Sequence, residues 1–253
     1  VSGMDMMDDI RQQALRFGAD IHEGSVTACE LSDTKKIVTI DDKKTIEAEA
    51  VIIATGASAR YLGLESERKF RGMGVSACAV CDGFFYRKKD VAVIGGGDTA
   101  VGDALYLSGI ANKVYLIVRK NYLRASKVLQ ERVSNTPNIE ILFEHVTKEV
   151  LGDNSGVTGL RLEKQGKDEV IINITGMFLA IGHNPNTSIF KGQITLDENG
   201  YIVTEGKGTQ TNIKGVFACG DVQDPTYRQA ITAAASGCKA ALDTERYLLS
   251  KGE

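Results

Sequence analysis

Two cysteines and an acidic residue stand close together in the segment Cys-Ala-Val-Cys-Asp-Gly at positions 78–83. Two thiols at this spacing can close a short disulfide, and the spacing shifts their pKa values, as redox chemistry requires. A zinc site would need two further cysteine or histidine ligands at a matching spacing, which the sequence does not contain, and two inert buried cysteines are the other alternative. We therefore favour a redox-active pair, Cys78 and Cys81, with the Asp82 carboxyl group beside the second sulfur to move protons.

A glycine-rich turn follows this pair, between a short apolar run and a stretch with helical periodicity. Its residues fit the pattern G-x-G-x-x-G/A and are Gly95, Gly96, Gly97, Asp98, Thr99 and Ala100. In that pattern the first glycine makes a tight turn, Gly97 lets the backbone approach a pyrophosphate, and Ala100 lets the helix pack closely on the strand. The helix N-terminus also favours an anion. The segment predicts a dinucleotide site, with a glycine turn that binds no ligand as the alternative.

The end of the next strand indicates which dinucleotide binds. An NAD-binding protein offers Asp or Glu to the ribose 2'-hydroxyl about 20 residues beyond the first glycine. Here the chain reads Val118-Arg119-Lys120, with Arg124 close behind, and it offers no carboxylate. Cations at this place bind a 2'-phosphate through charge-assisted hydrogen bonds, so we predict NADPH rather than NADH. The alternative is a solvated basic turn.

Further candidate residues lie toward the two ends of the chain and suggest a flavin. A hydride carries two electrons, and flavin is a carrier that can pass them on to sulfur. Two apolar runs, 50–54 and 215–219, have the pattern of strands buried on both faces, and both end in a glycine turn. The candidate FAD-binding residues follow these runs or begin the last helix: Ala54, Thr55, Gly56, Gly220, Asp221, Arg228, Gln229 and Ala230. The Asp221 carboxylate could accept hydrogen bonds from sugar or ribitol hydroxyls, or it could simply cap a helix.

Apolar periodicity places these residues on an α/β framework. Between Val91 and Val118 the chain reads strand, helix, strand, the βαβ unit of dinucleotide-binding folds. Other elements are expected as an amphipathic helix at 4–17, an antiparallel meander at 21–48, a helix at 126–134, strands at 139–143 and 177–181, and an antiparallel group at 149–174. A last helix at 227–249 is expected to pack close to a sheet or a bound cofactor through a face rich in small residues: Ile231, Ala234, Ala235, Cys238, Ala241 and Leu242.

Composition excludes several classes of protein. The 253 residues suffice for one or two domains, and 30 basic against 33 acidic residues give a net charge of −3, too balanced for a nucleic-acid-binding surface. No apolar run approaches the roughly 18 residues of a membrane span, so a soluble protein is expected. Five cysteines, three of them isolated, favour a reducing, cytoplasmic location over a secreted disulfide framework. His22, His145 and His183 lie far apart and are interpreted as surface or loop residues, so no metal site is predicted.

The order of these motifs along the chain resembles that of the low-molecular-weight, bacterial-type thioredoxin reductases. The resemblance runs from the first helix to the last and is most specific between Ala54 and Gly97. It implies an α/β protein with two dinucleotide-binding, Rossmann-like, three-layer domains, one inserted into the other. Residues 1–59 and 184–253 would form the FAD-binding domain, and residues 60–183 the NADPH-binding domain with the redox cysteines. Before Ala54 the glycines are scattered, and the family's first βαβ unit, which holds the ADP part of FAD, is not found. The chain is therefore expected to be an N-terminally truncated form of such an enzyme.

The family's mechanism, carried onto this chain, defines the expected activity. NADPH would reduce FAD, and the flavin would reduce a Cys78/Cys81 disulfide, which would then reduce the disulfide of thioredoxin. Cys81 would face the flavin, Cys78 would attack thioredoxin, and Asp82 would act as general acid and base. One domain would rotate against the other about links near Arg60 and Asn184, and the enzyme would be a cytoplasmic homodimer.

Two positions depart from the family's pattern, and two other functions stay open. Val118 stands where the family often has His, and Gly102 stands where it usually has an acid, inside a helix that glycine weakens. The first alternative function is a related flavin reductase of another thiol partner. The second is an inactive fragment that binds NADPH without a full FAD site.

Overall fold

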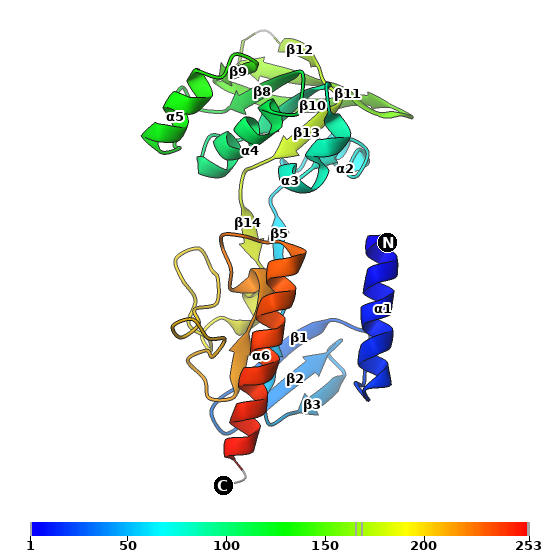
Figure 1. The fold of residues 1–253 in the computed structure, drawn as a ribbon, viewed down its shortest axis with the longest axis vertical. Coiled ribbons are helices and arrows are strands. Elements are labelled where there is room, and N and C mark those ends of the chain that lie inside the picture. The colour runs from blue at the N-terminus through cyan, green and yellow to red at the C-terminus, as the bar shows by residue number, and fades with distance from the viewer. Residues whose placement is uncertain (1, 165, 168, 252–253) are drawn as a thin grey trace. The chain divides into compact units, whose positions relative to one another are not determined.

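The computed structural model describes residues 2–164, 166–167 and 169–251, and in it the chain divides into two compact units (Figure 1). The outer unit comprises the residues up to Gly56 together with those from Pro185 onward. The inner unit comprises Ala57–Asn184. At the two crossings between the units the chain forms a two-stranded pair, β5 (Ala57–Ala59) with β14 (His183–Pro185).

The inner unit is built on a five-stranded parallel sheet with the strand order β6-β13-β7-β8-β9. Its strands are β6 (Val75–Ser76), β7 (Asp90–Ile94), β8 (Lys113–Val118), β9 (Ile139–Phe143) and β13 (Gly176–Leu179). Its helices are α2 (Glu65–Lys69), α3 (Ala79–Asp82), the 3-10 turn η1 (Gly83–Tyr86), α4 (Asp98–Ser108) and α5 (Lys127–Ser134). An antiparallel meander follows as β10 (His145–Asp153), β11 (Gly156–Lys164) and β12 (Glu169–Asn173). The βαβ unit expected between Val91 and Val118 is therefore present.

In the inner unit, helices and the β10–β12 meander lie on the two faces of the sheet (Figure 1). Side chains alternate between these faces along each strand. Val91, Val93 and Phe178 point to one face and pack with α4 and α5. Ala92 and Met177 point to the other face and pack with the β10–β12 meander. Both faces of the sheet are thus covered, which accounts for the continuously apolar sequence of its central strands.

The outer unit contains an antiparallel meander and a short parallel pair. The meander is β1 (Val26–Leu31), β2 (Lys36–Ile40) and β3 (Lys44–Glu47), and the parallel pair is β4 (Val51–Ile53) with β15 (Val216–Ala218). Helical segments are α1 (Gly3–Arg16), η2 (Ser188–Phe190), η3 (Gly220–Val222) and α6 (Ala230–Ser250). Leu31, Ile53 and Phe190 belong to the core that joins the meander, the parallel pair and the loop between η2 and β15.

The expectation that 50–54 forms a strand buried on both faces is only half right. Ile53 is buried at 3% exposure, but Ile52, on the opposite face, keeps 41% of its surface exposed. Its neighbour in register is Phe217, which is buried against Ala240 and Tyr247 of α6. The helix therefore covers one strand of the pair on this face and leaves the other open.

The small-residue face of the last helix does not pack on a sheet, and its packing on a bound cofactor stays a prediction. The six residues expected to pack, from Ile231 to Leu242, are all exposed. The helix packs instead through another face: the Ser236 hydroxyl accepts the Gly220 N–H at 2.8 Å, and the Tyr247 ring lies over Gly215, where a Cβ atom would come within 2.6 Å of it. The described contacts of α6 with the strands thus come from Ser236, Ala240 and Tyr247. The helix α1 forms where it was expected, but none of its residues is buried.

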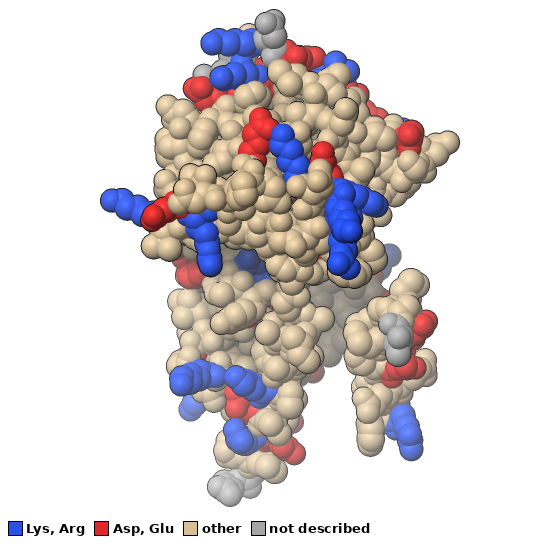
Figure 2. Space-filling view, turned by 45° about the horizontal axis from the view of Figure 1, so that its top comes forward, with Lys and Arg blue, Asp and Glu red and all other residues tan. Residues whose placement is uncertain are grey.

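The surface carries charges of both signs. On the face shown in Figure 2, Lys and Arg side chains are interspersed with Asp and Glu, as the net charge of −3 suggests. Within the described ranges, no helix is long and apolar enough to cross a membrane. Nor do the described residues contain a group of three or more His, Cys, Asp and Glu side chains that could hold a metal ion.

Candidate active site

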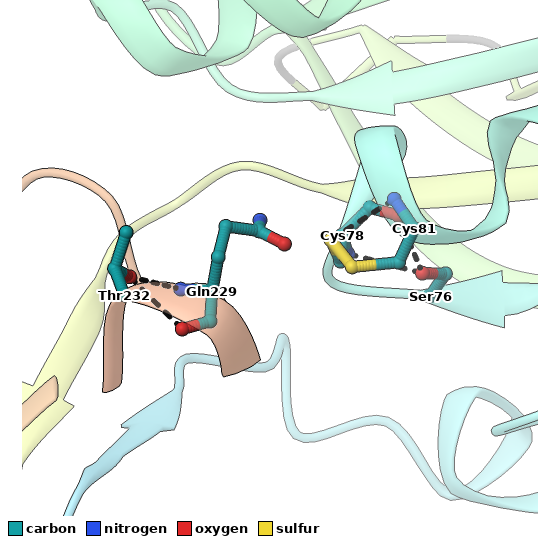
Figure 3. The surroundings of a disulfide bond; sticks show 5 residues. All are labelled: Ser76, Cys78, Cys81, Gln229 and Thr232. Carbon is teal, nitrogen blue, oxygen red and sulfur yellow. Dashed lines mark hydrogen bonds between the residues drawn. A yellow bond between two sulfur atoms is a disulfide. The ribbon is translucent and has the colours of Figure 1, made fainter. Parts of the chain in front are cut away.

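Cys78 and Cys81 form a disulfide in the inner unit, with 5.3 Å between their Cα atoms (Figure 3). The expected disulfide is therefore present. Cys78 follows β6 and is the N-cap of α3, whose first turn carries Cys81. The Ser76 hydroxyl accepts the Cys78 N–H at 3.0 Å, and the Cys81 N–H points to the Cys78 sulfur at 3.2 Å. Cys78 is half-buried and Cys81 is exposed.

Asp82 ends α3 directly beside the disulfide. Its N–H donates to the Cys78 carbonyl oxygen at 3.1 Å, a hydrogen bond that closes one helical turn of the motif. Burial raises the pKa of the Tyr86 hydroxyl, and the nearby negative charge of Asp82 raises it further. Phe84 and Phe85, which follow Asp82 in the chain, are 68% and 72% exposed. A carboxyl group and two exposed aromatic rings thus accompany the sulfur atoms.

The other three cysteines are not paired with one another in the described structure. Burial raises the pKa of the Cys29 thiol and of the Cys219 thiol, which favours the protonated form of each. Cys238 is exposed on α6. The disulfide thus distinguishes Cys78 and Cys81 from the other three cysteines.

A cavity of about 500 Å³ opens in the inner unit where the parallel strands end. The turn after β7 and the basic segment after β8 meet there because Ile94 and Ile117 are in register on neighbouring strands. The Arg124 N–H donates to the Gly96 carbonyl oxygen at 2.7 Å, which ties the basic segment to the glycine-rich turn. The cavity is lined by Arg60, Leu62, Ile94, Gly95, Gly96, Ile117, Val118, Arg119, Lys120, Tyr122, Arg124, His145, Val146, Thr147, Ala180 and Ile181.

The glycine-rich turn has the shape that a dinucleotide needs. Gly95 has φ +147°, and a Cβ atom there would stand 2.5 Å from the Ala180 carbonyl oxygen, so only glycine fits. A Cβ atom on Gly97, by contrast, would meet nothing within 4 Å, which leaves open space at the N-terminus of α4. The fully buried Ala100 lies on the first turn of that helix. Thr99 is exposed, and the Asp98 carboxylate accepts the Ser126 N–H at 2.8 Å.

A buried hydroxyl in the cavity wall also fits a polar ligand. Thr147 is 8% exposed, and its Oγ1 has no hydrogen-bond partner among the described residues. Such a group usually finds a partner, so a bound ligand or water is expected beside it. The cationic rim, the open glycine turn and this hydroxyl together fit a phosphorylated dinucleotide.

Sequence reasoning missed part of this cavity. Arg60, His145 and Thr147 come from segments far from the glycine-rich turn, and no local spacing marks them. His145 was expected on the surface or in a loop, but it lies on β10, where its ring contacts the Phe143 carbonyl oxygen at 2.7 Å. Tyr122 stands between Lys120 and Arg124, and its place in the basic segment could have indicated it.

In the outer unit, the predicted FAD residues also come together. Ala54–Gly56 and Gly220-Asp221 follow β4 and β15, which pair in parallel, so they lie at the same edge. The Thr55 hydroxyl donates to the Asn186 carbonyl oxygen at 2.8 Å. Gly220 has φ +72°, and a Cβ atom there would lie 3.7 Å from the Ala233 methyl group of α6. The strand ends and the start of the long helix thus form one polar edge with exposed backbone.

The start of α6 differs from the expected one. The helix begins at Ala230, with Gln229 as its N-cap, and the Gln229 N–H donates to the Thr232 hydroxyl at 3.3 Å (Figure 3). Arg228 precedes it with φ +46°, and its guanidinium donates to the Pro225 carbonyl oxygen. Asp221 lies in η3 and not at the start of α6. The alternative in which Asp221 caps the long helix is therefore wrong.

Comparison with known proteins places the chain in a family. The model of the pyridine nucleotide-disulphide oxidoreductases matches residues 10–237. A thioredoxin reductase from Coxiella burnetii is 50% identical over 257 residues, and the match covers 98% of this chain and 80% of that protein. A thioredoxin reductase from Vibrio cholerae is 49% identical over 261 residues, and the match covers 100% of this chain and 81% of that protein. The chain belongs to the thioredoxin reductases. The structure of thioredoxin reductase from Giardia duodenalis superposes with a TM-score of 0.91 at 40% identity, covering 98% of this chain and 82% of that one.

Membership of the thioredoxin reductases confirms several expectations. The resemblance drawn from the motifs is correct, as is the α/β fold with Rossmann-like dinucleotide-binding domains. Thioredoxin reductases are flavoprotein oxidoreductases, so FAD and NADPH are the cofactors and reduction of the thioredoxin disulfide is the activity. This main interpretation is favoured over a reductase of another thiol partner and over an inactive fragment.

Proposed function

We propose that the inner unit binds NADPH and carries the catalytic disulfide, and that the outer unit binds FAD. One observation supports this division above all: the Cys78–Cys81 disulfide and the cavity with the basic rim belong to the same compact unit. The predicted division assigned residues 1–59 and 184–253 to FAD and residues 60–183 to NADPH, and the boundaries of the two units, 56/57 and 184/185, lie within three residues of these.

In the inner unit, the glycine-rich turn and the basic segment hold the nucleotide. Gly95, Gly96 and Gly97 let the pyrophosphate approach the backbone at the start of α4, where Asp98, Thr99 and Ala100 form the first turn. Arg119, Lys120 and Arg124 are exposed at the rim, and their positive charges attract the 2'-phosphate. The nucleotide is therefore held by backbone donors at its centre and by side-chain cations at one end.

In the outer unit, the ends of β4 and β15 hold the flavin. When bound, FAD supplies a group that accepts the two electrons of a hydride and releases them to a disulfide. Ala54, Thr55 and Gly56 offer backbone groups, while Asp221 offers a carboxylate next to Gly220 for hydroxyl groups of the ligand. Arg228, Gln229 and Ala230 stand at the start of α6 and contribute donors there. These residues bind and orient the cofactor.

The disulfide performs the sulfur chemistry. Its reduction breaks the Cys78–Cys81 bond, takes up two electrons and two protons, and leaves two thiols. The Cys78 thiolate then attacks one sulfur of the thioredoxin disulfide, and Cys81 attacks Cys78 to release reduced thioredoxin. Asp82, at the end of the same short helix, gives and takes the proton at the second sulfur. Each cycle restores the disulfide of this chain.

The surroundings of the enzyme are part of the same proposal. It works in the cytoplasm as a homodimer, bound neither to membrane nor to nucleic acid. Three cysteines outside the redox pair support a reducing compartment. Exposed apolar side chains on α1 and α6, among them Met7, Ile231 and Leu249, support a protein interface in the outer unit. Light scattering on the purified chain tests the dimer.

The role of Cys78 is tested by comparing two cysteine variants. NADPH oxidation is measured with oxidised thioredoxin and added FAD. Cys78→Ser is expected to abolish thioredoxin reduction, whereas Cys238→Ser, which changes an exposed cysteine outside the pair, should keep it. If Cys78→Ser still reduces thioredoxin at the wild-type rate, the disulfide is not the donor and the proposal is wrong.

A further inference from the structure

Tyr122 lies on the rim of the nucleotide cavity, between two of the cations that line it. Half of its surface is exposed, and its hydroxyl oxygen accepts a hydrogen bond from the Lys120 ammonium group at 2.7 Å. A phenol both accepts and donates hydrogen bonds, so the hydroxyl proton of Tyr122 can serve a further acceptor. Tyr122 therefore offers a donor at the place where the cations gather.

The backbone around Tyr122 is held on both sides. The Glu144 N–H donates to the Lys120 carbonyl oxygen at 3.2 Å, and the Arg124 N–H donates to the Gly96 carbonyl oxygen at 2.7 Å. Leu123, between Tyr122 and Arg124, is buried at 7% exposure. The Tyr122 ring thus belongs to a segment whose backbone is held by hydrogen bonds to the glycine-rich turn and to Glu144, and this fixes its position at the rim.

Val118, at the start of the same segment, offers no polar group to the rim. Its side chain is 3% exposed and packs beneath Gly96, where a Cβ atom would come within 3.0 Å of it. A buried isopropyl group donates no hydrogen bond. The donors that the basic segment presents at the rim are accordingly Arg119, Lys120, Arg124 and the Tyr122 hydroxyl.

We propose that the Tyr122 hydroxyl donates a hydrogen bond to the 2'-phosphate of NADPH and so helps this chain to select NADPH over NADH. The inference rests on the proposed assignment of the cavity to NADPH and adds a specificity-determining residue to it. Lys120 binds the phenol oxygen and attracts the phosphate, so one cation supports both contacts. The hydrogen bond and the positive charge of Lys120 also lower the pKa of Tyr122, which makes its hydroxyl a stronger donor.

Two adenosine nucleotides that differ by one phosphate isolate this contact. Binding of adenosine 2',5'-bisphosphate and of adenosine 5'-monophosphate to the full chain is measured by calorimetry. Tyr122→Phe keeps the ring and removes only the hydroxyl. We expect it to weaken binding of the bisphosphate roughly threefold to tenfold, the effect of one partly exposed hydrogen bond to a charged group, and to leave binding of the monophosphate unchanged. Tyr106→Phe, on α4 and outside the cavity lining, is the matched control and should bind both nucleotides as the wild type does.

The possible outcomes separate this inference from the assignment on which it rests. Unchanged bisphosphate binding in Tyr122→Phe overturns the inference, as does an equal loss for both nucleotides, which would mean that the hydroxyl acts on the adenosine part. If the wild type shows no preference for the bisphosphate, the NADPH assignment of the cavity fails, and the inference fails with it. A wild-type preference that Arg119→Gln weakens and Tyr122→Phe does not would leave the assignment intact and refute the role of Tyr122 alone.

Discussion

Glu67 offers a sharp test of how the inner unit holds its cavity. Its side chain is fully buried, at 0% exposure, and its carboxylate accepts the N–H groups of Leu62 and Gly63, both at 2.9 Å. Leu62 lines the nucleotide cavity, and Arg60 lines it two residues earlier. One carboxylate on α2 therefore fixes the loop that forms part of the cavity wall.

Replacing Glu67 with alanine should be costly. The substitution removes the charged acceptor of two partly buried hydrogen bonds, and a hydrogen bond to a charged group contributes about 1.5–3 kcal/mol. A loss of about 3 kcal/mol or more is expected for the inner unit, which corresponds to a fall in its melting temperature of about 10 °C. Glu67→Gln keeps one acceptor oxygen but turns an N–H group toward the other donor, so its loss should be smaller.

The assay is thermal unfolding followed by circular dichroism, with nucleotide affinity as a second readout. Glu65→Ala is the matched control, since Glu65 is an exposed acid on the same helix. Surface substitutions of this kind change stability by about 0.5 kcal/mol at most. Glu67→Ala should also weaken nucleotide binding at temperatures where it is still folded, because the loop that carries Arg60 and Leu62 loses its anchor. If the melting temperature of Glu67→Ala equals that of Glu65→Ala, the Glu67 carboxylate does not hold this loop.

Three further predictions concern the same unit. Gly102 lies inside α4, and a Cβ atom there would meet nothing within 4 Å. Gly102→Ala should therefore stabilise the chain by about 0.5–1 kcal/mol in thermal unfolding. A lower melting temperature would show that the added methyl group meets a neighbour. The double variant Arg119→Gln/Lys120→Gln should raise KM for NADPH roughly tenfold and leave KM for NADH nearly unchanged in steady-state assays. An unchanged coenzyme preference would refute the proposal that these cations bind the 2'-phosphate. Asp82→Asn should lower the rate of thioredoxin reduction roughly a hundredfold, as expected for loss of a general acid and base, and a wild-type rate would exclude that role.

Local sequence signals predicted the elements whose residues lie close together in the chain. The βαβ unit from β7 to β8 combines a buried strand, a glycine-rich turn and a helix within a short segment, so its fold was predicted from the sequence. The same holds for the disulfide, because the two cysteines are separated by a single helical turn. In both cases the interactions that fix the structure are local, and the order and spacing of the residues indicate them.

Contacts between distant segments could not be predicted in this way. Thr147 lies in the cavity wall because β10 returns across the sheet, and its isolated hydroxyl has no signature in the sequence. Small residues of α6 suggested close packing on a sheet or a cofactor. In the structure Tyr247 packs over Gly215 from another face of the helix, and Ile231 and Leu242 are exposed. Glu67 is an acid within a short polar helix, and only the fold shows that two backbone N–H groups meet it.

The most direct test of the central claim is to map the thiols that NADPH generates. The chain is incubated with FAD and NADPH without oxygen and without thioredoxin, then alkylated and analysed by mass spectrometry. Two new alkylated thiols per chain are predicted, at Cys78 and Cys81, while the labelling of Cys29, Cys219 and Cys238 stays as it was before NADPH. If NADPH produces no new thiols, or produces them elsewhere, electrons do not pass through this disulfide and the proposed chemistry is contradicted.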